Sequence, residues 1–178
     1  MLDKLTIERI LPVKSPFLMV DSVVSYQNTT LPKLITERKI CNSDPFYSYE
    51  GESSLLPSVY VIEGLAQTAI LLSNIFSIEL LKTDMNIASS TSLSSFINAN
   101  LDKLHFAGEK NQSFAATGLL ALVEIEITGK VFQEDLLLFE VEQQKVFADN
   151  SRYSVKAFVG ENEVANGFLI GSRSKRTG

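Results

Sequence analysis

The chain has 178 residues, 45 % of them hydrophobic, which is enough for one globular domain with a core and too apolar for a disordered protein. A net charge of −5 offers no basic footprint for nucleic acid or for anionic lipid. With one cysteine and one histidine, the sequence excludes an internal disulfide and a histidine-rich metal site.

The N-terminal residues 1–16 mix charged and apolar side chains and lack the long apolar run of a signal peptide. We therefore expect a soluble, cytoplasmic protein. Residues 17–26 are rich in β-branched and aromatic side chains and predict a strand, and residues 33–40 predict a second strand after a polar turn.

A long helix is predicted from Pro57 to about Lys82, after a loop with many turn residues. Proline suits the first turn of a helix, and Ser58 or the serines before it can cap the helix. The segment is apolar on nearly every side, so the helix should be surrounded by protein. Polar side chains, among them Glu63 and Gln67, interrupt the run too often for a membrane span.

The segment 83–118 is rich in Ser and Asn, and a second helix is expected in it. One helical face would collect Leu93, Phe96, Ile97, Leu101 and Leu104.

Four further strands are predicted over 122–128, 136–147, 152–160 and 163–171, and short turns suggest that they form an antiparallel meander. Residues 172–178 are expected to be a frayed tail. One buried helix needs a sheet that wraps around it, so the sequence predicts an α+β fold in a single domain, 1–178.

Glu63 is the residue that most calls for an explanation, because a buried carboxylate must be paired, hydrogen-bonded or neutral. Glu63 and Gln67 lie four residues apart and share a helical face. A buried carboxyl group can serve as a general acid near neutral pH, and it can equally be a structural group at a subunit contact. At the start of the helix, the N–H groups of Ser58 and Val59 favour a developing negative charge.

Other candidates carry weaker patterns. His105 could be a base, but no acid or nucleophile pattern surrounds it, and Ser58 lacks the glycine-flanked elbow of a serine hydrolase. The aromatic residues Phe46 and Tyr49, together with Phe17, could line a pocket or belong to the core.

Three stretches together resemble the 3-hydroxyacyl-acyl-carrier-protein dehydratases of the FabZ type. LPVKSPFLMVDSVVSY resembles their opening L-P-H-R-x-P-F-L-L-V-D-R-V, and LLPSVYVIEGLAQTA resembles their helix motif M-P-G-V-L-I-I-E-A-L-A-Q. The ending DLLLFEVE…SVKAFVGENEVANGFLIGSR resembles their last three strands in order and spacing. The resemblance covers about four fifths of the chain, and the insertion at about 83–118 has no clear counterpart.

The resemblance implies a hotdog fold, in which a curved antiparallel sheet wraps around one long helix. It also implies a dimer with acyl tunnels at its interface, a carrier-protein thioester as substrate, and no cofactor. Glu63 aligns with the family's catalytic glutamate, which exchanges a proton with the 3-hydroxyl, and Gln67 aligns with the glutamine one turn later. Ser58 stands where the family has a glycine whose N–H holds the thioester carbonyl.

The family's catalytic histidine has no counterpart here. Tyr49 or Glu50 falls at its position, depending on where a gap is placed. A tyrosine side chain, with an ordinary pKa near 10, is poorly suited to remove a C2 proton at neutral pH.

Three functions follow from this pattern. The chain could contribute Glu63 to a heterodimeric dehydratase with a histidine-bearing partner. It could be an atypical homodimeric dehydratase that uses Tyr49, Glu50 or His105, or it could bind acyl chains or acyl carrier protein without turnover. A thioesterase on the same fold fits the motifs less well. For an acidic carrier protein, the candidate docking groups are Lys33, Arg38 and Lys39, or the basic tail 172–176.

Overall fold

The computed structural model describes residues 2–44, 54–87, 91–100, 117–147 and 150–174. In chain order they form the helix α1 (Lys4–Ile10), the strands β1 (Ser22–Gln27) and β2 (Lys33–Lys39), the helices α2 (Ser58–Asp84) and α3 (Leu93–Asn100), and the strands β3 (Thr117–Ile127), β4 (Leu136–Phe147), β5 (Asn150–Val159) and β6 (Asn162–Ser174).

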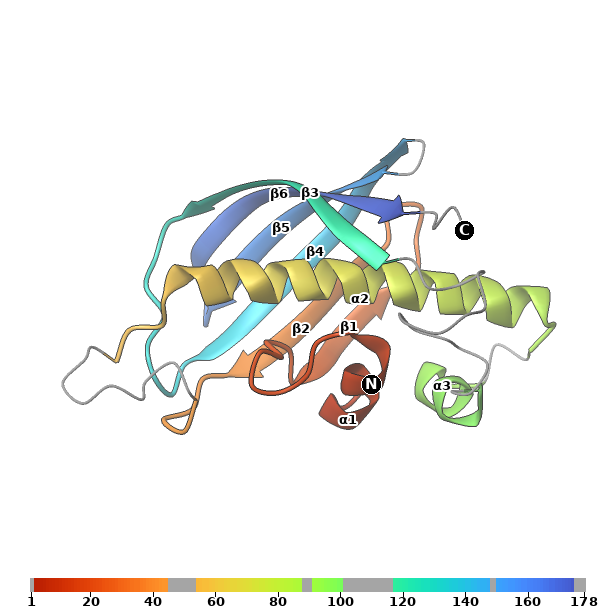
Figure 1. Ribbon diagram of the computed structural model, residues 1–178, viewed down its shortest axis with the longest axis horizontal. Coiled ribbons are helices and arrows are strands. Elements are labelled where there is room, and N and C mark those ends of the chain that lie inside the picture. The colour runs from red at the N-terminus through yellow and green to blue at the C-terminus, as the bar shows by residue number, and fades with distance from the viewer. Residues whose placement is uncertain (1, 45–53, 88–90, 101–116, 148–149, 175–178) are drawn as a thin grey trace.

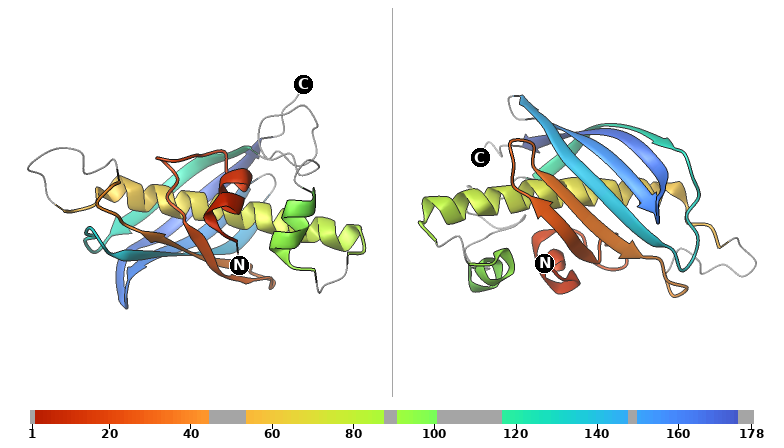
Figure 2. Two further views of the ribbon diagram at one scale, coloured as in Figure 1. Left: turned by 90° about the horizontal axis from the view of Figure 1, so that it is seen from below. Right: turned by 180° about the vertical axis from the view of Figure 1, so that it is seen from behind.

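The strands form one antiparallel sheet in the order β1-β2-β4-β5-β6-β3. The sheet curves around α2, while α1 and α3 lie next to each other along one flank of that helix (Figure 1 and Figure 2). This arrangement confirms the predicted α+β fold, with a curved antiparallel sheet around one long helix.

The position of β3 differs from the prediction. Strands β4, β5 and β6 form a meander as expected, but β3 pairs with β6 at the edge of the sheet instead of with β4. The two sides of β4 are already occupied by β2 and β5, so β3 cannot pair with β4 and instead forms an edge strand beside β6. Strand β6 continues to Ser174, so the predicted frayed tail begins later than residue 172.

Two features of the N-terminal region were not predicted correctly. Strand β1 begins at Ser22 rather than at residue 17, because the N–H of Met19 donates to the Gln67 side chain of α2 instead of to a neighbouring strand. The helix α1 was missed, although Asp3 caps it by accepting a 2.9 Å hydrogen bond from the N–H of Thr6.

Helix α2 lies against the concave face of the sheet. Its residue Gly64 allows a close approach, since a Cβ atom there would be 2.1 Å from Cζ of the buried Phe139 on β4. One helical turn after Gly64, the hydroxyls of Thr68 on α2 and Thr36 on β2 form a 2.7 Å hydrogen bond. Pro57 is the N-cap, and no side chain of the described residues caps the helix, so Ser58 is not the cap that the sequence suggested.

Among the described helices, α2 is the one long and apolar enough to cross a membrane by length and composition. Most of the qualifying window is buried, 61 % of it, and the sheet packs on the buried side chains. This is the environment of a core helix in a soluble protein, as predicted.

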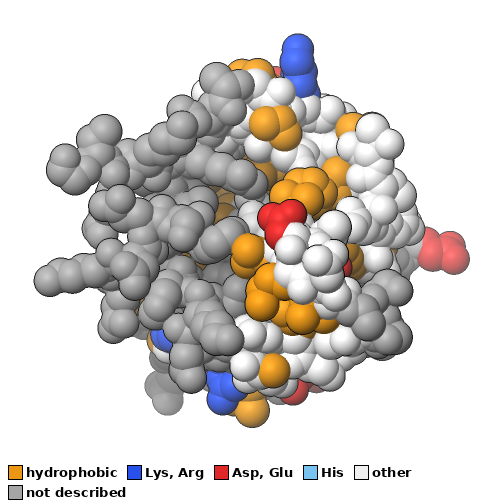
Figure 3. Space-filling view, turned by 90° about the vertical axis from the view of Figure 1, so that its right-hand side faces the viewer, with side chains coloured by type: hydrophobic (Ala, Val, Ile, Leu, Met, Phe, Trp, Pro, Cys, Tyr) orange, Lys and Arg blue, Asp and Glu red, His pale blue; other side chains and the backbone are white. Residues whose placement is uncertain are grey.

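The helix predicted in the segment 83–118 is present as α3, which buries Phe96 and Ile97. Its proposed face also included Leu101 and Leu104, which lie outside the described residues. The connection to α2 is held by Lys82, whose Nζ donates to the carbonyl of Thr91 at 3.0 Å and to Glu79 at 3.2 Å. Figure 3 shows hydrophobic side chains gathered on this end of the molecule, which the C-terminal end of α2 reaches.

The hydroxyl of Tyr26 on β1 is buried and has no hydrogen-bond partner among the described residues. Burial and, secondarily, the negative charge of Glu79 raise the pKa of Tyr26 to about 12. Unfolded tyrosine ionises near pH 10, so between about pH 10 and 12 the unfolded chain binds fewer protons than the folded chain, and stability must fall.

We therefore expect the free energy of unfolding of the wild type to fall by about 1 kcal/mol between pH 10 and 12, allowing for solvent screening of a half-buried side chain. In Tyr26→Phe this fall should be absent. Urea unfolding at pH 8, 10 and 11.5 measures this. The variant Tyr153→Phe retains Tyr26 and should keep the alkaline loss. Equal pH profiles for wild type and Tyr26→Phe would contradict the prediction.

Candidate functional site

Glu63 lies in the second turn of α2, on the side of the helix that faces away from the sheet. The residues that share this side, Ile62, Ala66 and Ile70, are partly buried, as is Glu63 itself. The sheet covers the opposite face of α2, where Val61, Gly64, Leu65, Thr68 and Leu72 are buried. Glu63 is thus a partly buried carboxylate in a mostly apolar helix face.

Gln67 connects Glu63 to the segment that precedes β1. Its Nε2 donates to Glu63 Oε1 at 2.8 Å and to the carbonyl of Phe17 at 2.8 Å. Its Oε1 accepts from the N–H of Met19 at 2.7 Å. The spacing of Glu63 and Gln67 predicted a shared face, and the structure confirms a direct hydrogen bond between them.

The other oxygen of Glu63, Oε2, accepts no hydrogen bond from the residues that the structure describes. One oxygen is therefore held by a buried amide, while the second has no hydrogen-bond partner among the described residues. A carboxyl group with one fixed and one available oxygen can exchange a proton with a hydroxyl group in a defined position.

The first two residues of α2, Ser58 and Val59, are exposed, with Val59 at 61 %. Within the described parts of the chain, their backbone N–H groups donate to no partner, as is usual at a helix start. Val59 precedes Glu63 by four residues, so the two lie on one side of α2 about 6 Å apart along the axis.

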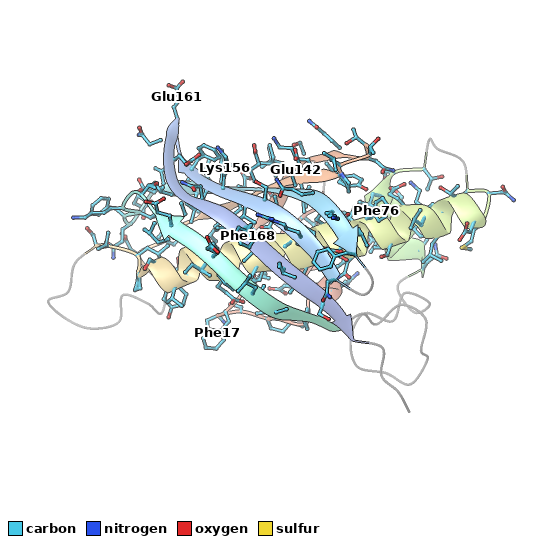
Figure 4. The ribbon with its side chains drawn as sticks, turned by 90° about the horizontal axis from the view of Figure 1, so that it is seen from above. Phe17, Phe76, Glu142, Lys156, Glu161 and Phe168 are labelled. Atoms are coloured by element: carbon cyan, nitrogen blue, oxygen red, sulfur yellow. The ribbon has the colours of Figure 1, made fainter. Side chains whose placement is uncertain are left out.

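The aromatic candidates are placed only in part. The Phe17 side chain is 62 % exposed, and Figure 4 shows its ring projecting outward at the same margin of the molecule as β3. Phe46, Tyr49, Glu50 and His105 lie outside the described residues.

An ion-pair cluster around buried Arg38, which the sequence did not predict, lies beside the Phe17–Met19 segment. Arg38 on β2 donates to Asp21 at 2.8 Å and to Asp44 at 2.6 Å, and its side chain is 7 % exposed. Asp21 also accepts from Lys4 and from the N–H of Lys39.

The alternation of inward and outward residues along β2 could have indicated this cluster. Arg38 shares the inward face of the strand with the buried Leu34 and Thr36, and an inward arginine requires carboxylate partners.

The predicted docking cations on β2 are already paired. Lys33 forms a 2.9 Å ion pair with Glu140, Lys39 forms a 3.4 Å ion pair with Glu134, and Arg38 is buried. These residues do not form a free basic patch, because carboxylates of the same chain neutralise them. Within the described ranges, no group of three His, Cys, Asp or Glu side chains is placed to hold a metal ion.

Comparison with proteins of known sequence finds FabZ-type dehydratases as relatives of this chain. No protein-family model matches the chain. It is 24 % identical over 164 residues to the 3-hydroxyacyl-[acyl-carrier-protein] dehydratase FabZ of Chlamydia muridarum, which spans 92 % of this chain and 86 % of the relative. The same enzyme of Thermotoga petrophila is 38 % identical over 64 residues, 35 % of this chain and 44 % of the relative.

Comparison with solved structures supports the fold. The dehydratase heterocomplex ApeI:P from Xenorhabdus doucetiae matches 96 % of this chain and 92 % of its own with a TM-score of 0.63 and 12 % identity. A hypothetical thioesterase with coenzyme A from Streptococcus pneumoniae covers 86 % of this chain and 85 % of its own, with a TM-score of 0.52 and 11 % identity. The structural similarity supports the hotdog fold that the sequence resemblance implied.

Proposed function

Because the chain is a hotdog-fold homologue of the FabZ-type 3-hydroxyacyl-acyl-carrier-protein dehydratases, we propose that it acts on 3-hydroxyacyl thioesters of acyl carrier protein in the cytoplasm. It contributes Glu63 to a dehydratase site that is completed by a histidine-bearing hotdog partner. The observation that carries this proposal is the Glu63 carboxylate, held at one oxygen by buried Gln67 and open at the other.

Dehydration of a 3-hydroxyacyl thioester requires an acid and a base. The base removes a proton from C2, the C3–O bond breaks, and the hydroxyl leaves as water after it accepts a proton. Glu63 is the proton donor to the hydroxyl, while the partner's histidine takes the C2 proton. The N–H groups of Ser58 and Val59, at the start of the same helix, stabilise the negative charge that develops on the thioester carbonyl oxygen.

A second subunit is proposed because one edge of the sheet carries exposed apolar side chains and the Glu63 face of α2 is only partly buried by the described residues. The edge strand β3 has a free side, and its Leu120, Leu122, Val123 and Ile127 are between 39 % and 48 % exposed. The face of α2 that carries Glu63 is also apolar. A long apolar edge strand is a template for pairing, so a partner that covers both surfaces would place Glu63 at the interface.

For the carrier protein, we propose a docking surface at the end of the β4–β5 hairpin where Phe147 pairs with Asn150. Lys145 and Arg152 are exposed and lie opposite each other in register. The Arg152 guanidinium lies 4.1 Å from the centre of the Phe168 ring, and neither cation pairs with a carboxylate of the described residues. These two exposed cations therefore suit an acidic segment of the carrier protein.

The proposal is tested by measuring dehydration of a 3-hydroxyacyl-carrier-protein thioester by the chain alone and by the chain co-purified with a histidine-bearing FabZ-like homologue. We expect turnover only in the complex, and a loss of at least about 100-fold in kcat for Glu63→Gln. The control Glu79→Gln changes another carboxylate of α2, hydrogen-bonded to Lys82, and should retain activity.

Two other outcomes would overturn the heterodimer. Turnover by the chain alone would indicate a homodimeric dehydratase with a base among Tyr49, Glu50 and His105. Carrier-protein binding without turnover in either preparation, unchanged by Glu63→Gln, would indicate a binding protein.

A further inference from the structure

The side chain of Gln67 forms three hydrogen bonds in the interior, and it is only 1 % exposed. Both hydrogens of its Nε2 are used, one on the Phe17 carbonyl and one on Glu63 Oε1. Since no amide hydrogen is left over, Gln67 has none to donate to a substrate.

The orientation of this amide is fixed by its surroundings. If the amide were reversed, Nε2 would face the N–H of Met19, which is also a donor. Oε1 would then face the carbonyl oxygen of Phe17 and the carboxylate of Glu63, which are both acceptors. Three buried contacts would become repulsive, so only the observed orientation is stable.

This orientation has a consequence for Glu63. Because Gln67 always presents an N–H to Oε1, that oxygen acts as an acceptor whether or not the carboxyl group is protonated. A proton on Glu63 must therefore reside on Oε2, the oxygen without a described partner. The same amide ties the carboxyl group to the backbone at Phe17, whose side chain is exposed.

We propose that Gln67 is a positioning residue, which assigns proton exchange to Oε2 of Glu63 and fixes the direction in which that oxygen points. The role in proton exchange rests on the proposed function, but the hydrogen bonds of Gln67 can be tested without measuring any activity.

The test uses Gln67→Met, which has a similar size and lacks all three hydrogen bonds. The matched control is Thr68→Val, because Thr68 is the next residue, is equally buried, and bonds to Thr36 and to the Gly64 carbonyl without touching Glu63. Both variants lose buried hydrogen bonds, so a general loss of stability would affect both.

The first readout is NMR of the complete chain. The two Nε2 protons of Gln67, assigned by their disappearance in Gln67→Met, should exchange slowly with solvent because both donate to internal acceptors. In Glu63→Ala one of the two resonances should shift strongly and the other weakly. In a sample with carbon-13-labelled glutamate, the Glu63 carboxyl resonance should move in Gln67→Met and stay in place in Thr68→Val. Equal, small shifts of both Nε2 protons in Glu63→Ala would overturn the proposal.

The second readout is kcat and KM of the complex with the histidine-bearing partner. Gln67→Met should lower kcat about 10- to 100-fold with little change in KM, since the substrate does not contact Gln67. Thr68→Val should keep kcat within about two-fold of wild type. Full kcat in Gln67→Met, with Glu63→Gln inactive, would overturn the positioning role and leave the proposed function intact. An inactive wild-type complex would overturn the function, while the NMR result would still decide on the hydrogen bonds.

Discussion

Gly167→Ala is expected to separate β3 from the sheet. Gly167 lies in β6 opposite Ile125 of β3 and has a φ of +153°, a backbone conformation that residues with a side chain rarely adopt. A Cβ atom at this position would lie 2.0 Å from the carbonyl oxygen of Glu124 and 2.8 Å from Cα of Ile125. Both are backbone atoms, so the contact can be relieved only if one of the two strands moves.

We expect Gly167→Ala to lower the free energy of unfolding by about 3 kcal/mol or more, through backbone strain and the lost β3–β6 pairing. Hydrogen exchange should accelerate in β3 more than in β4 and β5. If β3 contributes to the subunit interface, association with a partner should weaken as well. Urea unfolding, hydrogen-exchange mass spectrometry and analytical ultracentrifugation measure these effects.

Gly171→Ala is the matched control in the same strand. A Cβ atom there would meet Cε2 of Tyr153 at 3.5 Å, which is an ordinary contact. This variant should lose less than about 1 kcal/mol. Similar stabilities for the two variants would show that the close approach at Gly167 does not limit the fold.

Arg38→Met is the second substitution with a large expected effect. It leaves Asp21 and Asp44 without the guanidinium that bridges them in a mostly buried place. Removing one partner of a buried ion pair typically costs about 3–5 kcal/mol, because the remaining charge stays buried without compensation. That applies most to Asp44, which is 10 % exposed and pairs with no other cation of the described residues, whereas Asp21 keeps Lys4. We expect a loss of this size in chemical unfolding at pH 7.

The neighbouring Lys39→Met provides the comparison. The Lys39 and Glu134 side chains are 47 % and 61 % exposed, and an exposed pair contributes less than about 1 kcal/mol. Adding Asp21→Asn and Asp44→Asn to Arg38→Met removes the carboxylate charges that faced Arg38. The triple variant should recover part of the lost free energy of unfolding. A loss in Arg38→Met no larger than that in Lys39→Met would contradict the ion pairs described above.

Local sequence patterns were sufficient for most of the secondary structure. The apolar run after Pro57 predicted α2, alternation over 122–128 predicted a strand within β3, and strand-forming runs between turn residues predicted β2, β4, β5 and β6. The spacing of Glu63 and Gln67 likewise required only the helical repeat, so their common face was predictable.

Other features depended on partners distant in the sequence. No local pattern shows that β3 pairs with β6, that the N–H of Met19 donates to Gln67, or that Arg38 forms an ion pair with Asp21. For this reason the strand that was predicted to begin at residue 17 begins at Ser22. These contacts join residues that only the folded chain brings together.

The sequence alone therefore determined the elements, the buried helix and the residue types that could exchange a proton. Only the tertiary structure decided which oxygen of Glu63 is held, which cations are already neutralised and which strand edge is left open. The physical reason is that periodicity reports burial along one element, whereas hydrogen-bond and charge partners depend on how separate elements pack.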